Sequence, residues 1–240
     1  MKKIEDLIKT NKKYGKTIVQ KKLKSKKNTV AYVMMNNKPR VLKWFVPGLK
    51  RNMENEYKIL KKAKPDLNVP VVYEKDDKNN VLIMNYIPGE NLCDIINDED
   101  TTYEEKERLM ILLSEWFYRF HNFFKKDGEF LIHGDSSLRN FIFTDQICGM
   151  DFEEIRKGKP SEDIAGMCAS ILSTDPMFTE EKFNLSKVLI DKYIKLAPGR
   201  ITDIDDEIAY SLLEKIQWRP QQEEILRKYS KKIRQKGLNK

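Results

Sequence analysis

The chain has 240 residues and a mass of 28.4 kDa, enough for one large domain or two small lobes. No stretch approaches the ~18 uninterrupted apolar residues of a membrane span, and charged residues interrupt the N-terminal segment, which argues against a signal peptide. The cysteines Cys93, Cys148 and Cys168 are odd in number and widely spaced, which favours buried, reduced thiols over disulfides or a zinc site. We therefore expect a cytoplasmic protein.

The net charge of +8 is concentrated near the N-terminus. Residues 1–50 contain 15 Lys and Arg against two acidic residues. Such a field attracts the phosphates of a nucleotide, a nucleic acid or an anionic surface. A solvated lysine coat is an equal alternative, because the chain has 35 Lys and only 10 Arg, and Arg is favoured in specific phosphate recognition. No aromatic residues interleave these lysines as in single-stranded nucleic-acid binders, so a nucleic-acid role rests on charge alone.

The N-terminal third reads as strands with one helix. β-rich runs at 17–23 and 29–35 flank a polar tip, which predicts a hairpin. A third strand is expected at 39–45, an amphipathic helix at 51–64 that stops before Pro65, and two further strands at 69–73 and 81–84.

Beyond Pro88-Gly89 the pattern changes to helices. They are expected over 102–124, 161–174, 179–196, 203–217 and 220–235. We therefore predict an α+β fold of two lobes, a small β-rich N-lobe with one helix (residues 1–87) and a larger, mostly helical C-lobe (88–240). Ligands commonly bind where lobes meet.

The segment 131–154 fits neither pattern and contains oxygen-bearing side chains at the ends of short expected strands. Asp135 and Asn140 lie in an irregular loop, and Asp151 follows the next strand. Carboxylate and amide oxygens suit a hard cation such as Mg²⁺. The spacing also matches the D-x-x-x-x-N catalytic loop followed by a DFG-like motif. A set of Asx turns and caps is the alternative explanation.

These motifs resemble those of the protein-kinase-like phosphotransferases, in the aminoglycoside phosphotransferase and choline kinase branch. The resemblance rests on His133-Gly134-Asp135, Asn140, Asp151-Phe152-Glu153 and Asp163-Ile164-Ala165, and it spans about residues 29–172 in the right order. It implies a two-lobed, protein-kinase-like fold that uses ATP and Mg²⁺.

The resemblance also assigns roles to single residues. Lys43 would hold the α- and β-phosphates of ATP, paired with Glu56. Glu54 is a rival partner on the same helix, and an ordinary strand lysine is the alternative for Lys43. Asn140 and Asp151 would hold Mg²⁺. Asp135 would orient the acceptor hydroxyl and take its proton.

Adenine and the phosphates would be contacted by the N-lobe. The backbone of Asn85 and Ile87 would meet adenine, with Met84 behind the ring, and an ordinary edge strand is the alternative there. The hairpin tip, Lys24 to Asn28, contains no glycine, so the expected phosphate contacts are made by the side chains of Ser25, Asn28 and Thr29.

Four further residues lie in or near these motifs. Asp163 would brace the catalytic loop or cap the helix expected at 161–174. His121 is expected to be a satisfied core histidine, and His133 a structural member of the loop. Glu153 occupies the position of the DFG glycine, and no role is assigned to it.

These features together predict an ATP- and Mg²⁺-dependent kinase that phosphorylates a hydroxyl of a small molecule, such as a sugar, an amino sugar or an amino alcohol. Only Phe152 to Glu162 lie between Asp151 and Asp163, which leaves no room for a long activation segment. The acceptor pocket is expected from residues 176–240, whose acidic residues would suit a cationic acceptor if they lined it. A compact RIO-like protein kinase and a pseudokinase acting as a binding module are the alternatives.

Overall fold

The computed structural model describes residues 2–63 and 67–238, which group into two compact units. The first comprises residues 1–88 together with 150–154, and the second comprises 89–149 and 155–240. The DFG-like motif therefore belongs to the first unit, whereas the loop that contains Asp135 belongs to the second.

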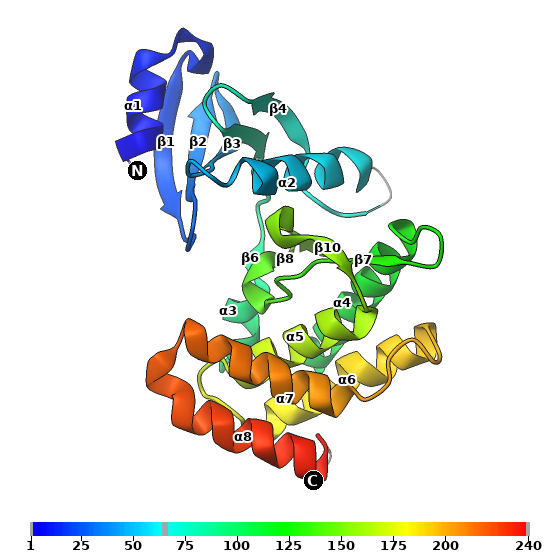
Figure 1. The fold of residues 1–240 in the computed structure, drawn as a ribbon. Coiled ribbons are helices and arrows are strands. Elements are labelled where there is room, and N and C mark those ends of the chain that lie inside the picture. The colour runs from blue at the N-terminus through cyan, green and yellow to red at the C-terminus, as the bar shows by residue number, and fades with distance from the viewer. Residues whose placement is uncertain (1, 64–66, 239–240) are drawn as a thin grey trace. The chain divides into compact units, whose positions relative to one another are not determined.

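The first unit is built on a five-stranded antiparallel sheet (Figure 1). Its strands are β1 (Thr17–Leu23), β2 (Thr29–Met35), β3 (Lys38–Trp44), β4 (Val72–Asp76) and β5 (Val81–Asn85), in the order β1-β2-β3-β5-β4. The hairpin and the third strand are confirmed to within a residue. β5 is the most buried strand, because four of its five residues are apolar and lie inside the unit.

A helix that the sequence analysis did not predict packs on this sheet. Helix α1 (Lys2–Thr10) and the short 3-10 helix η1 (Lys12–Tyr14) precede β1, so the expectation of one helix in this lobe was wrong. Ile4 and Tyr14 are fully buried in a core that includes Leu42 and Ile83 of the sheet. Burial of these apolar side chains stabilises the helix, since isolated helices of this length are marginal in water.

Helix α2 (Lys50–Ala63) contacts β4, β5 and the 3-10 helix η3 (Phe152–Glu154). Met53, Ile59 and Leu60 are buried, at the spacing of an amphipathic helix. The expected stop before Pro65 lies outside the described residues. Because η3 packs on α2, residues 152–154 are part of the first unit.

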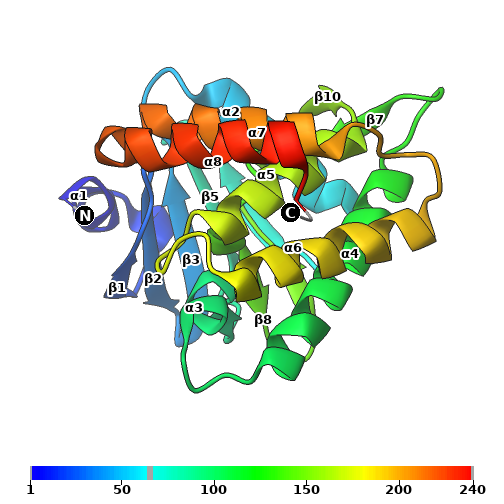
Figure 2. The ribbon, with the colours of Figure 1, turned by 90° about the horizontal axis from the view of Figure 1, so that it is seen from below.

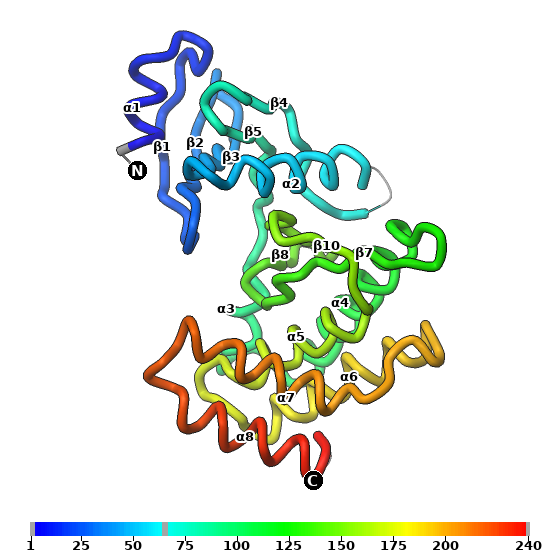
Figure 3. The backbone as a smooth tube through the Cα atoms, viewed as in Figure 1, coloured from blue at the N-terminus to red at the C-terminus, as the bar shows by residue number. Residues whose placement is uncertain are grey.

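Five longer helices form most of the second unit. They are α4 (Tyr103–Phe123), α5 (Pro160–Leu172), α6 (Glu180–Leu196), α7 (Ile204–Glu214) and α8 (Glu223–Lys236), close to the ranges that were predicted. Figure 2 shows α4 beside α6 and α7 beside α8, and these pairs are in contact. Between α7 and α8 the chain turns back through η4 (Lys215–Gln217) and η5 (Pro220–Gln222), as the tube in Figure 3 shows.

Short elements of the second unit hold the catalytic-loop segment. β6 (Glu90–Asn91), β8 (Phe141–Phe143) and β9 (Ile147–Gly149) form one small sheet, and β7 (Phe130–Ile132) pairs with β10 (Arg156–Gly158). Helix α3 (Leu92–Asn97) and the 3-10 helix η2 (Leu138–Asn140) lie against each other. A side chain at Gly149 would place its Cβ 2.3 Å from the Trp116 ring, so glycine allows β9 to approach α4.

Two expectations from composition concern the whole chain. Cys93, Cys148 and Cys168 are free and buried, as predicted. Among the helices of the described residues, none is both long and apolar enough to cross a membrane.

Candidate active site

Lys43 lies on β3 with its side chain inside a group of carboxylates. Lys43 is only 4% exposed to solvent. Its Nζ is 2.6 Å from Glu56 Oε2, donates a hydrogen bond to Asp151 Oδ1 and is 3.6 Å from Glu153 Oε2. Glu54 points elsewhere and pairs with Lys75 at 2.6 Å. The structure therefore brings Lys43 together with Glu56, and not with the rival glutamate.

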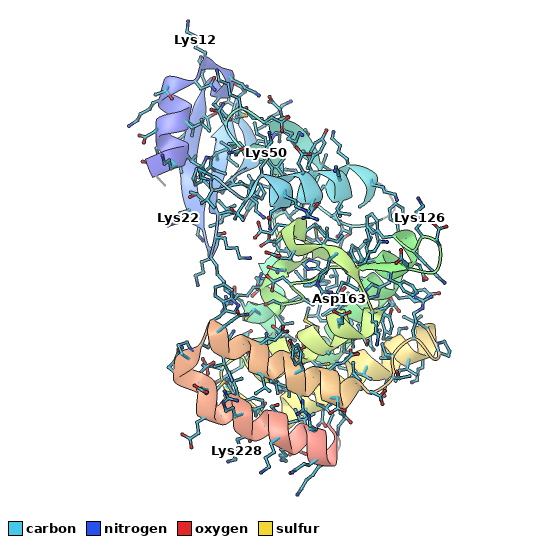
Figure 4. The ribbon with its side chains drawn as sticks, in the orientation of Figure 1. Lys12, Lys22, Lys50, Lys126, Asp163 and Lys228 are labelled. Atoms are coloured by element: carbon cyan, nitrogen blue, oxygen red, sulfur yellow. The ribbon has the colours of Figure 1, made fainter. Side chains whose placement is uncertain are left out.

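Burial distinguishes Lys43 from the other N-terminal lysines. Of the described lysine side chains between residues 3 and 50, Lys43 is the only buried one. Figure 4 labels three of the exposed ones, Lys12, Lys22 and Lys50. A buried ammonium is costly unless it is paired and hydrogen-bonded, so the three carboxylates explain why Lys43 is tolerated in this position.

The carboxylates outnumber the ammonium in this cluster. Burial would lower the pKa of Lys43, but the charges of Glu56, Asp151 and Glu153 outweigh it and raise that pKa. Burial raises the pKa of Glu56 to about 7 despite the attraction of Lys43, and it raises the pKa of Glu153 as well. With all three acids ionised the cluster would carry two unbalanced negative charges.

This donor set fits a divalent cation. One carboxylate oxygen from each of Glu56, Asp151 and Glu153 lies within 4.8 Å of the others. Carboxylate oxygens are the ligands that Mg²⁺ prefers, and two unbalanced charges match its valence. Asp151 also has a positive φ of 61°, an uncommon conformation for a residue other than glycine. Strained backbone of this kind is often found at functional sites.

The tip of the β1–β2 hairpin is tied to the segment after Asp151. Asn28 is 8% exposed, and its Nδ2 donates to Glu153 Oε2 at 2.5 Å. Lys27 forms an ion pair with Glu154, and the Ser25 hydroxyl accepts from the Asn28 N–H at 3.2 Å. Ser25 is exposed and Thr29 half-buried. Among the three predicted phosphate contacts, the side-chain amide of Asn28 therefore already donates a hydrogen bond to Glu153.

The predicted adenine-binding segment follows β5. Met84 is buried and Ile87 half-buried. The Asn85 N–H donates to the Val71 carbonyl at 3.0 Å, and its side-chain oxygen accepts from the Val71 N–H at 2.7 Å. The main-chain contact of Asn85 with adenine that the sequence predicted is thus restricted to its carbonyl group.

In the second unit, Asn140 is hydrogen-bonded to Asp135. The Asn140 Nδ2 donates to the Asp135 backbone oxygen at 2.8 Å and to its carboxylate at 3.2 Å. Asp135 is exposed. This arrangement uses the amide nitrogen of Asn140 and leaves its amide oxygen as the group that suits a metal ion.

Asp163 on α5, labelled in Figure 4, holds the residues on both sides of Asp135. It is 1% exposed and accepts from His133 N at 2.7 Å, Gly134 N at 3.1 Å and Ser136 Oγ at 2.6 Å. Burial would raise the pKa of Asp163, but the hydrogen bond and charge of His121, the charge of His133 and the hydrogen bond of Ser136 together outweigh it and lower that pKa. Because Lys159 is the N-cap of α5, the alternative of Asp163 as a helix cap was wrong.

His121 is a core residue whose two ring nitrogens both have partners. Nδ1 is 2.8 Å from the Tyr193 hydroxyl, and Nε2 is 3.0 Å from Asp163 Oδ2. The residue is fully buried, in agreement with the prediction of a satisfied core histidine.

Two groups of residues near the candidate site were not predicted from the sequence: Asn52, which contacts the DFG-like segment, and the arginines Arg139 and Arg219, which line a cavity. Asn52 on α2 contacts the backbone oxygen of Glu153 at 3.3 Å, and no motif marks it. Arg139 directly precedes Asn140, and Arg219 follows η4; both line a cavity of the second unit. Arg139 lies between Asp135 and Asn140 of the D-x-x-x-x-N motif. Its place in the cavity wall depends on residues distant in sequence, such as Arg219, so the sequence alone does not reveal it.

Comparisons with known proteins find similarity at the level of fold. No family model matches the chain. Over 88 residues, the chain is 33% identical to the KEOPS complex subunit Bud32 of Pyrococcus abyssi (strain GE5 / Orsay), and this segment spans only 36% of either protein.

Solved structures match over almost the whole chain. Aminoglycoside phosphotransferase APH(4)-Ia has a TM-score of 0.69 at 10% identity, covering 98% of this chain and 99% of that one. The ternary complex of APH(2")-IIa with streptomycin and ATP has a TM-score of 0.61 at 17% identity, with 92% and 89% coverage. An aminoglycoside-3'-phosphotransferase of type VIII scores 0.64 at 12% identity, with 88% and 97% coverage. The chain therefore has the protein-kinase-like fold of the aminoglycoside phosphotransferases.

Proposed function

We propose that the protein is an ATP- and Mg²⁺-dependent kinase that transfers the γ-phosphate to a hydroxyl group of a small molecule. The observation that carries this proposal is Lys43, held by Glu56 and Asp151 in a buried cluster with an excess of carboxylates. Phosphoryl transfer needs positioned positive charge around the phosphates more than covalent chemistry. A rigidly paired lysine beside a cation-binding carboxylate supplies both requirements.

Each unit contributes part of this machinery. In the first, Lys43 binds the α- and β-phosphates, Glu56 orients Lys43, and Asp151 is a ligand of Mg²⁺. Ser25, Thr29 and, once it releases Glu153, Asn28 bind phosphate oxygens, while Met84, Ile87 and the Asn85 carbonyl contact adenine. In the second, Asn140 offers its amide oxygen to Mg²⁺. When bound, the ion neutralises charge on the phosphates.

Asp135 is the proposed base for the acceptor. The acceptor oxygen attacks the γ-phosphorus, and the bond from that phosphorus to the bridging oxygen of ADP breaks. The hydroxyl proton passes to the Asp135 carboxylate, and ADP leaves with the electron pair of the broken bond. The Asn140 amide fixes the carboxylate for this task through its 3.2 Å hydrogen bond.

The likeness to solved structures supports a small acceptor over a protein acceptor. The neighbours include an aminoglycoside phosphotransferase in complex with streptomycin and ATP and one with gentamicin. A RIO-like protein kinase is the alternative function, and a pseudokinase is disfavoured because Lys43, Asp135, Asn140 and Asp151 are all present.

Lys43→Ala tests the proposal. Loss of a charge-assisted contact costs about 1.5–3 kcal/mol, so ATP affinity or turnover should fall roughly ten- to a hundred-fold. Lys75→Ala is the matched control, because Lys75 is also a strand lysine paired with a glutamate of α2 at 2.6 Å. The two variants are compared by calorimetric titration with ATP and Mg²⁺ after thermal unfolding shows that both fold. Equal ATP affinity and turnover in both would exclude the role of Lys43.

A further inference from the structure

The second unit contains a polar cavity directly beside the proposed catalytic loop. Its volume is about 350 Å³, at the lower end of the range for small-ligand pockets. Its wall includes Asn97 at the end of α3, Arg139 of η2, Asp175 after α5, and Arg219, Gln221 and Gln222 between α7 and α8. Arg139 is the neighbour of Asn140 in the chain, so the cavity adjoins the segment that would position the acceptor.

Positive charge predominates in this wall. Two arginines face one aspartate, and within residues 2–63 and 67–238 neither Arg139 nor Arg219 is among the arginines that form an ion pair with a carboxylate. Arg219 donates through one nitrogen to the Ser173 carbonyl at 2.6 Å, which fixes its guanidinium at the wall. A guanidinium without a carboxylate partner is available to bind an anion in bidentate geometry.

A buried lysine, whose pKa burial lowers to about 8, adds a third positive charge behind the wall below that pH. Lys182 is 2% exposed, and its Nζ donates to Asn97 Oδ1 at 2.9 Å and to the Thr174 carbonyl at 2.6 Å. Burial raises the pKa of the nearby Cys93 thiol; the charges of Arg139, Lys182 and Arg219 act to lower it, and the charge of Asp94 acts to raise it. The positive charges of Arg139, Lys182 and Arg219 therefore all act on the same group, the Cys93 thiol, beside the cavity.

The other polar groups of the wall suit hydroxyls. Asn97, Gln221 and Gln222 offer amides, and Asp175 offers a carboxylate. In the part of the chain that the structure describes, Gln222 Oε1 is buried without a hydrogen-bond partner. A buried acceptor left unsatisfied costs free energy, and a ligand hydroxyl reaching it would remove that cost.

We infer that the acceptor is a hydroxylated small molecule that carries an anionic group, phosphate or carboxylate, and that Arg139 and Arg219 bind this group. The inference rests on the proposed function, which it narrows. It also separates this protein from neighbours solved with streptomycin and gentamicin. A cationic amino sugar would meet two guanidinium groups, and like charges at short range are destabilising.

Binding of small probes without nucleotide tests the inference. Glucose 6-phosphate, glucuronic acid, inorganic phosphate, glucose and glucosamine are titrated into the full chain by calorimetry. We expect glucose 6-phosphate or glucuronic acid to bind at least ten-fold more tightly than glucose and glucosamine, and the two anions show whether phosphate or carboxylate is preferred. Equal or tighter binding of glucose or glucosamine, binding of phosphate alone, or no binding of either sugar anion would overturn the inference.

Variants locate the binding site. Arg139→Gln and Arg219→Gln should each weaken binding of the preferred anion roughly ten- to a hundred-fold. Arg227→Gln is the control, because Arg227 is an exposed arginine of α8 that pairs with Glu223. Arg139 is exposed, so its variant removes no buried contact and should fold. An unchanged affinity in the Arg139→Gln, Arg219→Gln double variant would exclude this cavity.

The test of the anionic acceptor can be distinguished from the test of the proposed kinase function. ATP is titrated into wild-type protein and Lys43→Ala in parallel. If ATP binding depends on Lys43 while the anionic sugars fail, the kinase proposal stands and the anionic acceptor falls. If the sugars bind through Arg139 and Arg219 while ATP does not bind, the cavity is an anion site and the kinase proposal falls.

Discussion

At the scale of single residues, Asp151 and Asp135 are carboxylates in different surroundings. Asp151 belongs to a cluster with Lys43 and two further acids, and its backbone has a positive φ. Asp135 is exposed and is hydrogen-bonded to the Asn140 amide. The first environment suits a metal ligand, and the second suits a base that must reach an acceptor.

Asn substitutions should separate these duties. Asp151→Asn should abolish Mg²⁺-dependent ATP binding, because it removes a charged ligand. Asp135→Asn should leave ATP affinity within about two-fold and remove phosphoryl transfer, because it removes only the proton acceptor. Calorimetric titration with ATP and Mg²⁺, together with ADP release, measures both. Equal losses of ATP binding in the two variants would contradict this division.

Asp76 illustrates a residue whose charge stabilises the first unit. It accepts hydrogen bonds from the Tyr14 hydroxyl at 2.8 Å and from both nitrogens of Asn79, and it lies 3.2 Å from Lys13 Nζ. Burial would raise the pKa of Asp76, but the hydrogen bonds of Asn79, Tyr14 and Lys13 outweigh it and lower that pKa to about 2. Ionised Asp76 thereby fastens η1 to β4.

This lowered pKa predicts a pH dependence of stability. The folded-state pKa lies below the unfolded value, so the contribution is present above about pH 4 and is lost as pH falls toward 2. Asp76→Asn should lower the free energy of unfolding at pH 7 by roughly 2 kcal/mol, and the difference from wild type should shrink between pH 5 and pH 2.5. Urea unfolding at several pH values measures it. The exposed neighbour Asp77 is the control, and an Asp76 effect that is independent of pH would be the contrary result.

At the scale of elements, α5 contacts the loop from His133 to Asn140 through Asp163 and through Ser170, whose hydroxyl accepts from the Leu138 N–H at 3.1 Å. Asp163 accepts two backbone N–H groups and one hydroxyl of the segment from His133 to Ser136. Gly134 has a φ of 80°, a conformation that glycine adopts at little cost. The loop is therefore positioned by a buried carboxylate, with glycine allowing the turn.

Replacement of Asp163 should loosen this loop and leave ATP binding intact. Asp163→Asn should lower stability by about 2 kcal/mol or more, because hydrogen bonds to charged groups contribute about 1.5–3 kcal/mol each. Ser136→Ala removes one of these bonds and should cost about 1.5–3 kcal/mol. Hydrogen exchange at the amides of His133 and Gly134 should quicken in Asp163→Asn only. Unchanged exchange at both amides would show that Asp163 does not position the loop.

Element prediction from sequence succeeded where the signal is local. β-rich runs around a polar tip predicted β1 and β2, and apolar spacing of three and four predicted α2. Helix α1 was missed because its lysines obscure Ile4 and Leu7, whose burial depends on the sheet. Helix α3 has six residues and depends on packing against η2, which no local pattern reveals.

At the scale of the whole molecule, the sequence motifs predicted which segments form the candidate site, but they did not predict which charged side chains meet there. Glu54 and Glu56 are two residues apart on α2, so they point to different sides of the helix, and only the folded structure shows which of them meets Lys43. Arg139 and Arg219 are distant in sequence and line one cavity in space. Two of the acidic residues in the segment 176–240 are paired within the fold, Asp206 with Arg234 and Glu207 Oε1 with the Ser161 hydroxyl.

The short interval between the DFG-like motif and α5 bears on the class of acceptor that we expect. That interval contains η3 and the short strand β10, which is paired with β7, and α5 begins at Pro160. A protein kinase needs a platform in this region to hold an extended peptide. No such platform fits between Glu154 and Pro160, so we expect small hydroxylated molecules to be phosphorylated and generic protein substrates to be ignored.

ADP release measured with a panel of sugars, sugar phosphates, uronic acids, amino sugars, amino alcohols and proteins would decide this. We expect turnover with at least one small hydroxylated acceptor and background rates with casein and histones, because the latter present hydroxyls only on long chains that the short interval cannot align. Asp135→Asn is the control that separates transfer from ATP hydrolysis by contaminants. Efficient phosphorylation of a protein, with no small acceptor in the panel, would instead favour the RIO-like alternative, since a compact kinase of that kind also lacks the activation segment.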